Sequence, residues 1–419
     1  MRKKYYFVIV IVALAVLALK LQSFVRPPIY SEEKVETVLT EPEEYNPVSE
    51  IEHTITHFDS ILDVNLKQSG TIGAAVVITY KGKVALMKCY GVRKAGEKSL
   101  VDRNTIFRLA SVSKPVTGVL AGILDAEKII DLDDKVIDYL PEFELKNQES
   151  TNNLTVRHLL SHTSGLVPHA YDLMVEDHVP LEKIIKRLDE VDITAPPGEL
   201  YGYQNVMYSI YDPIAERKTN KSFHALIKEK VFEPFGMKDA STGYEAFKNN
   251  QNKAYPHYNR GHNRFSPMRL NNKYYNTTPA AGVNASISDL SNFMIALSDE
   301  DSESISPKAR ETVFTPQVKS PLKRSYFRSW GRISSKQYSI GWRIVNYKGR
   351  TIAYHGGFVS GYKAEIAFCE EEEVGIAYLT NSPTNSSAKN IPAFLNMLFE
   401  YKDKLALENS SDEHVQDKS

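Results

Sequence analysis

Alternating and apolar runs near both ends of the chain predict β-strands. In the N-terminal part, the β-rich run 72–80 is followed by a Lys-Gly-Lys turn and by the returning run 84–91. In the C-terminal part, residues 363–369 alternate, a glutamate-rich turn follows, and residues 374–379 return. Two such runs joined by a short polar turn are typical of a hairpin. A helix is then expected over 390–401.

The middle of the chain carries apolar positions at helical spacing instead. Strands at both ends around a helix-rich middle indicate one antiparallel sheet that is built from both chain ends. We therefore predict an α/β fold, in which helices flank the sheet and a mainly helical lobe is inserted at about residues 106–325. The helices expected in this lobe are 115–126, 181–188, 205–217, 223–231 and 287–297.

The N-terminus has the pattern of an export signal. Basic residues from Arg2 to Lys4 precede an uncharged, mostly apolar run over 5–19. This pattern fits an uncleaved signal-anchor, a cleaved signal peptide or a buried core helix. We favour a signal-anchor over 1–22, because the Ala-x-Ala spacing lies inside the apolar run. The following domain is then held on the outer side of the cell membrane, or is secreted if cleavage occurs.

Composition marks further segments and excludes one class of partner. Residues 23–53 are rich in glutamate and are predicted to be an acidic linker, which leaves 54–403 as the folded domain and 404–419 as a polar tail. The 419 residues carry a net charge of −1, so no nucleic-acid partner is expected. Cys89 and Cys369 fall on candidate strands. Export permits a bridge between them, and two buried thiols are the favoured alternative.

Ser111 and Lys114 form the first candidate catalytic pair. In the sequence Ser-Val-Ser-Lys-Pro, these two residues stand three apart and share one helix face. Proline is tolerated in the first helical turn, so Pro115 places Ser111 at the helix N-terminus. The N–H groups there favour a developing oxyanion, and a desolvated Lys114 can act as a base. The alternative role for Ser111 is that of a helix cap.

Tyr203 and Asn205 form the second candidate segment, directly after an Ala-Pro-Pro-Gly loop. A tyrosine near a lysine can carry a proton, and an asparagine can hold a substrate amide. Tyrosine is common in this chain, with 24 residues, so the tripeptide alone carries little weight.

The third segment is His355-Gly356-Gly357, which ends a short run expected to be a strand at 351–354. Glycines allow a backbone to approach a ligand closely. The N–H of Phe358 is the candidate for a second oxyanion donor. The alternative is a structural histidine before a tight turn.

Two histidine pairs have the i,i+4 spacing found in zinc helices. They are His53 with His57 and His158 with His162. Neither pair carries the glutamate of the His-Glu-x-x-His pattern, so metal binding is not expected, and the second pair is expected to pack or to form hydrogen bonds. We expect no metal and no organic cofactor.

In order and separation, the three segments resemble those of the serine β-lactamase and penicillin-binding-protein superfamily. The resemblance covers about residues 54–400 and is closest to the class C β-lactamase-related branch, which includes D-peptidases and esterases. The flanking segments that add to it are FRLA at 107–110, LDDKV at 132–136, TVRHLLSHTSGL at 155–166, PFGM at 234–237, PAAG at 279–282 and SIGW at 339–342.

The resemblance implies a β-lactamase-like fold and an exported serine hydrolase that works through an acyl-enzyme. Ser111 matches the nucleophile, Lys114 and Tyr203 match the acid–base residues, and Asn205 matches the residue that orients the substrate amide. Either Lys114 or Tyr203 takes the serine proton. The implied substrate is a small molecule or peptide: a D-amino peptide or amide, an ester or a β-lactam, with cell-wall peptides among the candidates.

His355 and Gly357 match the substrate-binding motif whose sequence in many β-lactamases is Lys-Thr-Gly. That lysine offers a fixed cation for a substrate carboxylate, whereas histidine is mostly neutral near pH 7. We therefore expect no permanent cation at this place, which favours neutral esters or D-amino amides over β-lactams. Two other functions stay open: a penicillin-binding-type sensor that acylates but barely deacylates, and a non-catalytic scaffold tethered to the membrane.

Overall fold

The computed structural model describes residues 49–416 apart from 322–326, 332 and 385–386. The expected anchor at 1–22 and most of the expected acidic linker at 23–53 lie outside the described residues. No helix within the described ranges is both long and apolar enough to cross a bilayer.

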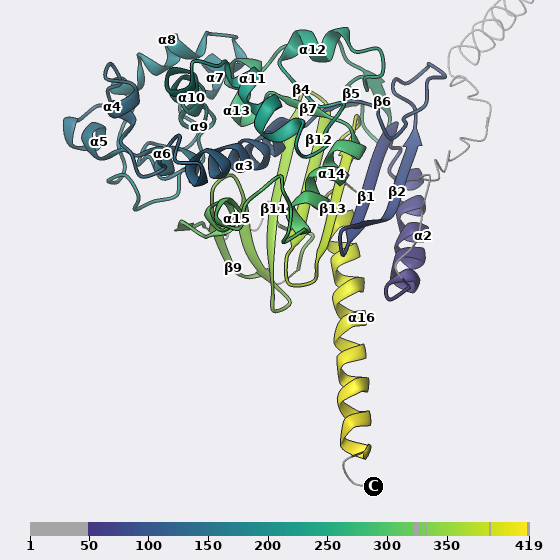
Figure 1. Ribbon diagram of the computed structural model, residues 1–419. Helices are drawn as coiled ribbons and strands as arrows, with labels where there is room; N and C mark the ends of the chain where they lie inside the picture. Colours follow the sequence, from purple (N-terminus) through teal and green to yellow (C-terminus); the bar gives the residue numbers. More distant parts are fainter. Residues whose placement is uncertain (1–48, 322–326, 332, 385–386, 417–419) are drawn as a thin grey trace, which may run out of the picture. The chain divides into compact units, whose positions relative to one another are not determined.

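An antiparallel sheet of eight strands forms the centre of the described domain, in the order β2-β1-β13-β12-β11-β10-β9-β8 (Figure 1). Its strands are β1 (Gly73–Tyr80), β2 (Lys83–Gly91), β8 (Val318–Lys319), β9 (Ile333–Tyr338), β10 (Arg343–Tyr347), β11 (Arg350–Val359), β12 (Tyr362–Cys369) and β13 (Val374–Thr380). Two small sheets join β3 (Phe107–Arg108), β7 (Val283–Ala285) and β4 (Ser241–Thr242), and β5 (His257–Asn259) with β6 (Phe265–Pro267).

Strands from the N-terminal and C-terminal parts of the chain pair with each other in this sheet. β1 pairs with β2 on one side and with β13 on the other, in a register that sets Ala74 opposite Thr380. All eight residues of β1 are buried, which fits its apolar, β-branched sequence because both faces of the sheet are covered. The predicted α/β fold with an antiparallel sheet from both chain ends is therefore confirmed.

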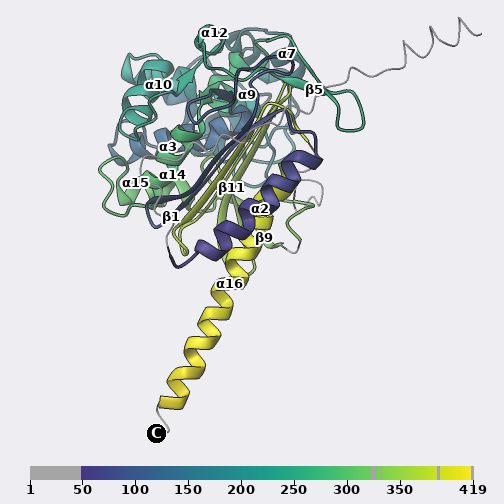
Figure 2. The same ribbon diagram turned by 90° about the vertical axis from the view of Figure 1, so that its right-hand side faces the viewer.

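Helices cover both faces of the sheet. α2 (Glu52–Gln68) and α16 (Ser387–Gln416) pack together on one face, while α14 (Ile287–Ser298) packs on β1 and β13 from the other (Figure 2). The remaining helices are α3 (Ser113–Ala126), α4 (Val136–Tyr139), α5 (Gln148–Asn153), α6 (Val156–Leu160), α7 (Asp172–Glu176), α8 (Leu181–Ile185), α9 (Asn205–Ser209), α10 (Tyr211–Thr219), α11 (Phe223–Ile227), α12 (Tyr244–Asn249), α13 (Thr278–Ala281) and α15 (Pro307–Phe314).

The two cysteines lie in different hydrophobic cores. Cys89 on β2 belongs to the core on the α3 side of the sheet, and Cys369 on β12 belongs to the core under α2 and α16. Both thiols are buried and they are not bridged to each other. Burial raises the pKa of the Cys369 thiol to about 12, so this sulfur stays protonated.

Two predicted elements differ from those in the structure. The helix expected over 205–217 is split into α9 and α10, because Pro213 has no N–H to bond the carbonyl one turn earlier. The strand expected at 351–354 is β11 and continues to Val359. The His-Gly-Gly segment therefore lies within a strand and not at a turn. The C-terminal helix is also longer than predicted, since α16 extends to Gln416.

Candidate active site

Ser111 lies at the entrance to the buried helix α3. It occupies a single 3₁₀ turn, η1 (Ala110–Val112), which runs directly into the helix. Ala110 has a φ of 48°, a left-handed conformation that costs a non-glycine residue energy. A left-handed conformation of a non-glycine residue is kept only where the surrounding structure stabilises it, and such conformations are common at functional sites. The sequence thus places Ser111 at a helix N-terminus, as Pro115 predicted.

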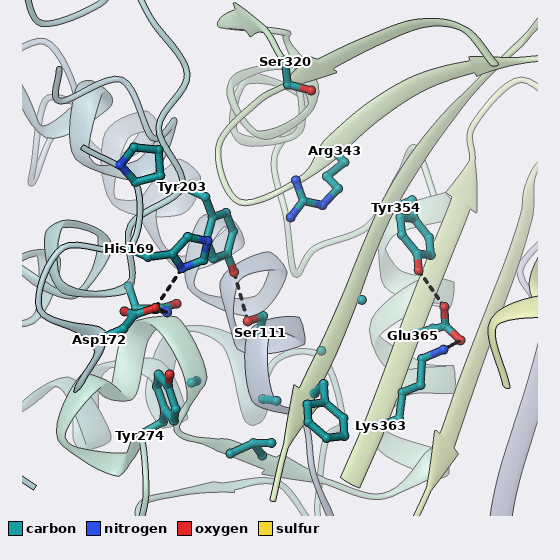
Figure 3. Close-up of a pocket in the computed structure, with 18 of the residues that line it drawn as sticks. Ser111, His169, Asp172, Tyr203, Tyr274, Ser320, Arg343, Tyr354, Lys363 and Glu365 are labelled. Carbon is teal, nitrogen blue, oxygen red and sulfur yellow. Dashed lines mark hydrogen bonds and ion pairs between the residues drawn. The ribbon is translucent and has the colours of Figure 1, made fainter. Parts of the chain in front are cut away.

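Tyr203 meets Ser111, and Lys114 lies behind it. The Tyr203 hydroxyl donates to Ser111 Oγ over 2.9 Å (Figure 3). Lys114 Nζ sits 4.6 Å from the centroid of the Tyr203 ring and is fully buried. It donates to Asn205 Oδ1 at 2.8 Å and to the Ala280 carbonyl at 3.1 Å. The three predicted catalytic side chains therefore converge from η1, α3 and the start of α9.

Burial lowers the pKa of Lys114 well below its ordinary value. Desolvation of the ammonium is the main cause, and the nearby Arg343 adds to it, while Asp172 acts in the opposite direction. The lowered pKa makes Lys114 a better candidate for a general base than an exposed lysine would be.

Asn205 connects Lys114 to a carboxylate. Its amide nitrogen donates to both oxygens of Asp172, at 3.1 and 3.2 Å. Asp172 Oδ2 lies 2.8 Å from His169 Nδ1. The result is a continuous row of polar contacts from Lys114 through Asn205 and Asp172 to His169. Asp172 and His169 were not among the residues predicted from the sequence.

The opposite wall of the site is the edge of β11. β10 pairs with β11 only as far as Tyr354, so residues 355–359 pair with β12 alone. At Gly357, a Cβ atom would lie 2.3 Å from the Leu109 carbonyl oxygen and 2.8 Å from Ser111 N. Close approach to the nucleophile, and not an unusual φ, therefore requires glycine here. Phe358 follows on this edge with a ring that is 66% exposed.

His355 faces away from the cavity. It is fully buried, with Nε2 3.2 Å from the Tyr338 hydroxyl and Nδ1 3.0 Å from the carbonyl oxygen of Gly356. Burial lowers its pKa well below the ordinary value, and Arg343 and Lys114 lower it further. The imidazole is therefore neutral and supports the strand, and this arrangement leaves it no direct contact with a substrate in the cavity.

Arg343 brings a permanent cation to the site from the neighbouring strand β10. Its guanidinium donates to the Tyr201 hydroxyl at 2.8 Å and lies 5.3 Å from the Tyr203 ring centroid. It also lines the cavity that contains Ser111. The structure thus adds a permanent cation that the sequence analysis did not foresee, and it comes from the strand next to the third motif and not from the position of His355 itself. Arg343 follows the Ser-Ile-Gly-Trp segment directly, which was the nearest signal for it.

One open cavity of about 970 Å³ joins these walls. That size is sufficient for a small peptide or a drug-sized molecule. Ser111, Tyr203 and Asn205 line it, as do His169, Asp172, Arg343, Gly357 and Phe358, whereas Lys114 and His355 lie behind it. Figure 3 shows the helical side of this cavity facing the strands.

The histidines at helical spacing have local roles. His158 Nδ1 accepts from the N–H of Thr155 in a capping box at the start of α6. His162 Nδ1 accepts from the N–H of Gln204, and its ring lies 4.3 Å from the Tyr203 ring. The hydrogen-bonding role expected of this pair agrees with these contacts. His162 in addition holds the segment that carries Tyr203.

Comparison with known proteins gives one family and several relatives. A sequence model of the family described as Beta-lactamase matches residues 58–395. Protein flp of Staphylococcus aureus (strain MRSA252) is 24% identical over 331 residues, which cover 77% of this chain and 62% of that protein. The Unguisins hydrolase ungD' of Aspergillus campestris (strain IBT 28561) is 25% identical over 311 residues, which cover 72% and 56%. This chain thus matches less than two thirds of the length of either relative.

The fold also matches a solved structure, that of the octameric penicillin-binding protein homologue from Pyrococcus abyssi. The TM-score is 0.71 at 23% sequence identity, covering 82% of this chain and 77% of that one. At this identity the likeness concerns the fold.

Proposed function

Because the chain belongs to the Beta-lactamase family, we propose that it hydrolyses acyl compounds through an acyl-enzyme on Ser111. The family match confirms the resemblance that the sequence motifs gave, and it makes the protein a member of a serine hydrolase superfamily. The observation that carries the proposal is the 2.9 Å contact between the Tyr203 hydroxyl and Ser111 Oγ, beside a buried lysine.

Acylation begins when Ser111 Oγ attacks the substrate carbonyl. Tyr203 is the group in contact with the serine hydroxyl, and Lys114 is the neighbour whose pKa is lowered by burial. We assign the serine proton to the Tyr203 oxygen, with Lys114 as the base that receives the tyrosine proton. Both candidates thus take part, Tyr203 in direct contact and Lys114 behind it. The leaving group is protonated along the reverse route.

The tetrahedral oxyanion needs donors close to Ser111. Gly357 brings the β11 edge against the backbone nitrogen of Ser111, so the N–H groups of Ser111 and Phe358 are the proposed donors. Removing one such donor costs about 3–4 kcal/mol of transition-state stabilisation in comparable enzymes. The side chain of Phe358 is left at the mouth of the cavity.

Arg343 supports a substrate with a carboxylate near the scissile bond. A guanidinium is always charged and binds carboxylates in a bidentate manner. It lines the cavity next to Tyr203, on the side where β10 ends its pairing with β11. D-amino peptides and β-lactams share this chemistry, whereas simple esters lack it. We therefore propose a D-amino peptide or β-lactam-like substrate before a neutral ester.

The test is a matched pair of substrates. An N-acyl D-amino dipeptide with a free carboxylate is compared with its neutral carboxamide, for the wild type and for Ser111→Ala. We expect turnover of both by the wild type, with a higher kcat/KM for the carboxylate, and loss of both in the variant. A wild type that forms an adduct but does not turn over would support the sensor. Equal activity of Ser111→Ala would contradict the proposal.

A further inference from the structure

His169 lines the cavity that contains Ser111. Its side chain is 59% exposed, and its Nδ1 is engaged by Asp172 at 2.8 Å. Its own backbone N–H donates to the Tyr203 carbonyl at 2.9 Å, and its ring lies 5.5 Å from the Tyr203 ring. With Nδ1 held by the carboxylate, Nε2 is the nitrogen available to water or substrate.

The backbone of His169 is adapted to this position. Its φ is 61°, in the left-handed region that histidine enters less readily than glycine or asparagine. The same conformation allows the backbone N–H to reach Tyr203 while the side chain reaches Asp172. Asp172 is in turn fixed by the Asn205 amide. The imidazole is thus oriented by groups that already belong to the site.

We propose that His169, oriented by Asp172, is the general base that activates water for hydrolysis of the acyl-enzyme. This role rests on the proposed function, and it separates a turnover enzyme from a sensor that stays acylated. Histidine with a carboxylate on its second nitrogen is a common arrangement for such a base. Acylation uses Tyr203 and Lys114, so the two half-reactions employ different bases.

Water adds its oxygen to the acyl carbon bonded to Ser111 Oγ, and one water proton passes to His169 Nε2. The tetrahedral intermediate then breaks its bond to Oγ, which takes a proton from the Tyr203 hydroxyl. The proton on His169 is returned to the tyrosinate through solvent. The net products are the free acid and Ser111 with its hydroxyl restored.

Several polar groups surround His169. Asp172 contacts it, and the Tyr203 ring packs beside it. Glu176 and Lys273 line the same wall and are paired with each other at 2.7 Å. A negative neighbour on Nδ1 stabilises the imidazolium that forms during the step.

The decisive variant is His169→Gly. Glycine accepts the left-handed backbone, so the fold is preserved while the imidazole is removed. With a chromogenic acyl donor, the burst should keep its rate, and the steady-state deacylation rate should fall about 100-fold or more. Intact mass should show the acyl-enzyme accumulating. Added imidazole should restore turnover.

His178→Gly is the matched control. His178 has the same φ of 61° and an exposed side chain, and it does not line the cavity. Its variant should deacylate like the wild type. An unchanged deacylation rate in His169→Gly, an equal fall in both half-reactions, or no response to imidazole would overturn the role of His169 while leaving Ser111 as nucleophile. Acyl hydrolysis that is retained in Ser111→Ala would overturn the proposed function and this inference together.

Discussion

The two walls of the cavity are built in different ways. The helical wall consists of side chains that contact one another: Tyr203 meets Ser111, Lys114 meets Asn205, and Asn205 meets Asp172. The sheet wall, which is the β11 edge over 355–359 with Arg343 beside it, offers a backbone edge and the guanidinium of Arg343.

This difference separates chemistry from recognition. On the helical wall, burial changes the acidity of a functional group, because desolvation lowers the pKa of Lys114. On the sheet wall, the guanidinium of Arg343 keeps its charge and His355 is held neutral behind the strand. We infer that the helical wall moves protons, while the sheet wall holds the oxyanion and an anionic substrate group.

Gly357→Ala should have the largest effect, because it pushes the two walls apart. The new Cβ would lie 2.3 Å from the Leu109 carbonyl oxygen and 2.8 Å from Ser111 N. We expect kcat to fall by about 100- to 1,000-fold, the usual effect of losing one oxyanion donor. Steady-state kinetics measures this, and thermal unfolding shows whether the variant is folded. A folded variant with wild-type kcat would show that the sheet wall takes no part in the chemistry.

Arg343→Gln should have a smaller and more selective effect. Losing a charged hydrogen bond to a carboxylate costs about 1.5–3 kcal/mol, so kcat/KM for the carboxylate substrate should fall about 10- to 100-fold. The kcat/KM for the neutral carboxamide should change little. In the wild type, added salt should reduce the difference in kcat/KM between the two substrates. Arg350→Gln is the control, since Arg350 on the same sheet pairs with Glu372 and Asp403 outside the cavity. Equal losses on both substrates would make Arg343 a packing residue.

The smallest effect concerns stability in acid. Burial keeps the folded pKa of His355 below the unfolded value of about 6.5, so as the pH falls the unfolded state gains a proton that the folded state does not. The contribution of neutral His355 to the unfolding free energy is therefore fully present above about pH 6.5, and it is lost progressively as the pH falls below that value. Between pH 7.5 and 5.5, His355→Gln should lose about 1.4 kcal/mol less unfolding free energy than the wild type.

Urea unfolding at the two pH values measures this difference. The comparison with the wild type is needed because Asp212 and Asp289 have pKa values of about 6, raised by burial, and stabilise the folded state as the pH falls. These terms are common to both proteins and cancel. An identical fall in unfolding free energy between the two pH values, in variant and wild type, would show that His355 takes up a proton in the folded protein.

Strands and the nucleophile helix were predictable because their signals are local. The β-branched run of β1 and the position of Pro115 each act within one element. The extent of β11 was not predictable, since Gly356 and Gly357 read locally as a turn. They are extended because β12 pairs with them and because Ser111 packs against Gly357.

The site residues that were missed come from outside the recognised motifs. Arg343 is placed by the pairing of β10 with β11, and Asp172 by its contact with Asn205, far along the chain. Apart from the Ser-Ile-Gly-Trp segment directly before Arg343, the local sequence does not distinguish either residue from a surface charge. His169 and Asp172 stand three apart just after the Ser-His-Thr-Ser-Gly segment, which is a weak signal in hindsight. Tertiary packing turns these ordinary residues into a connected site.

The most direct test of the account is the position of a covalent adduct. The protein is treated with a fluorophosphonate, digested, and the labelled peptide is identified by mass spectrometry. We predict one adduct on Ser111 and no labelling of Ser111→Ala, whose lost hydroxyl should cost at most about 2 kcal/mol of stability. Ser113 is the neighbouring alternative, but it is buried and its Oγ accepts the N–H of Val283 at 3.0 Å. Labelling retained in the Ser111→Ala variant, or mapped to Ser113, would contradict the account.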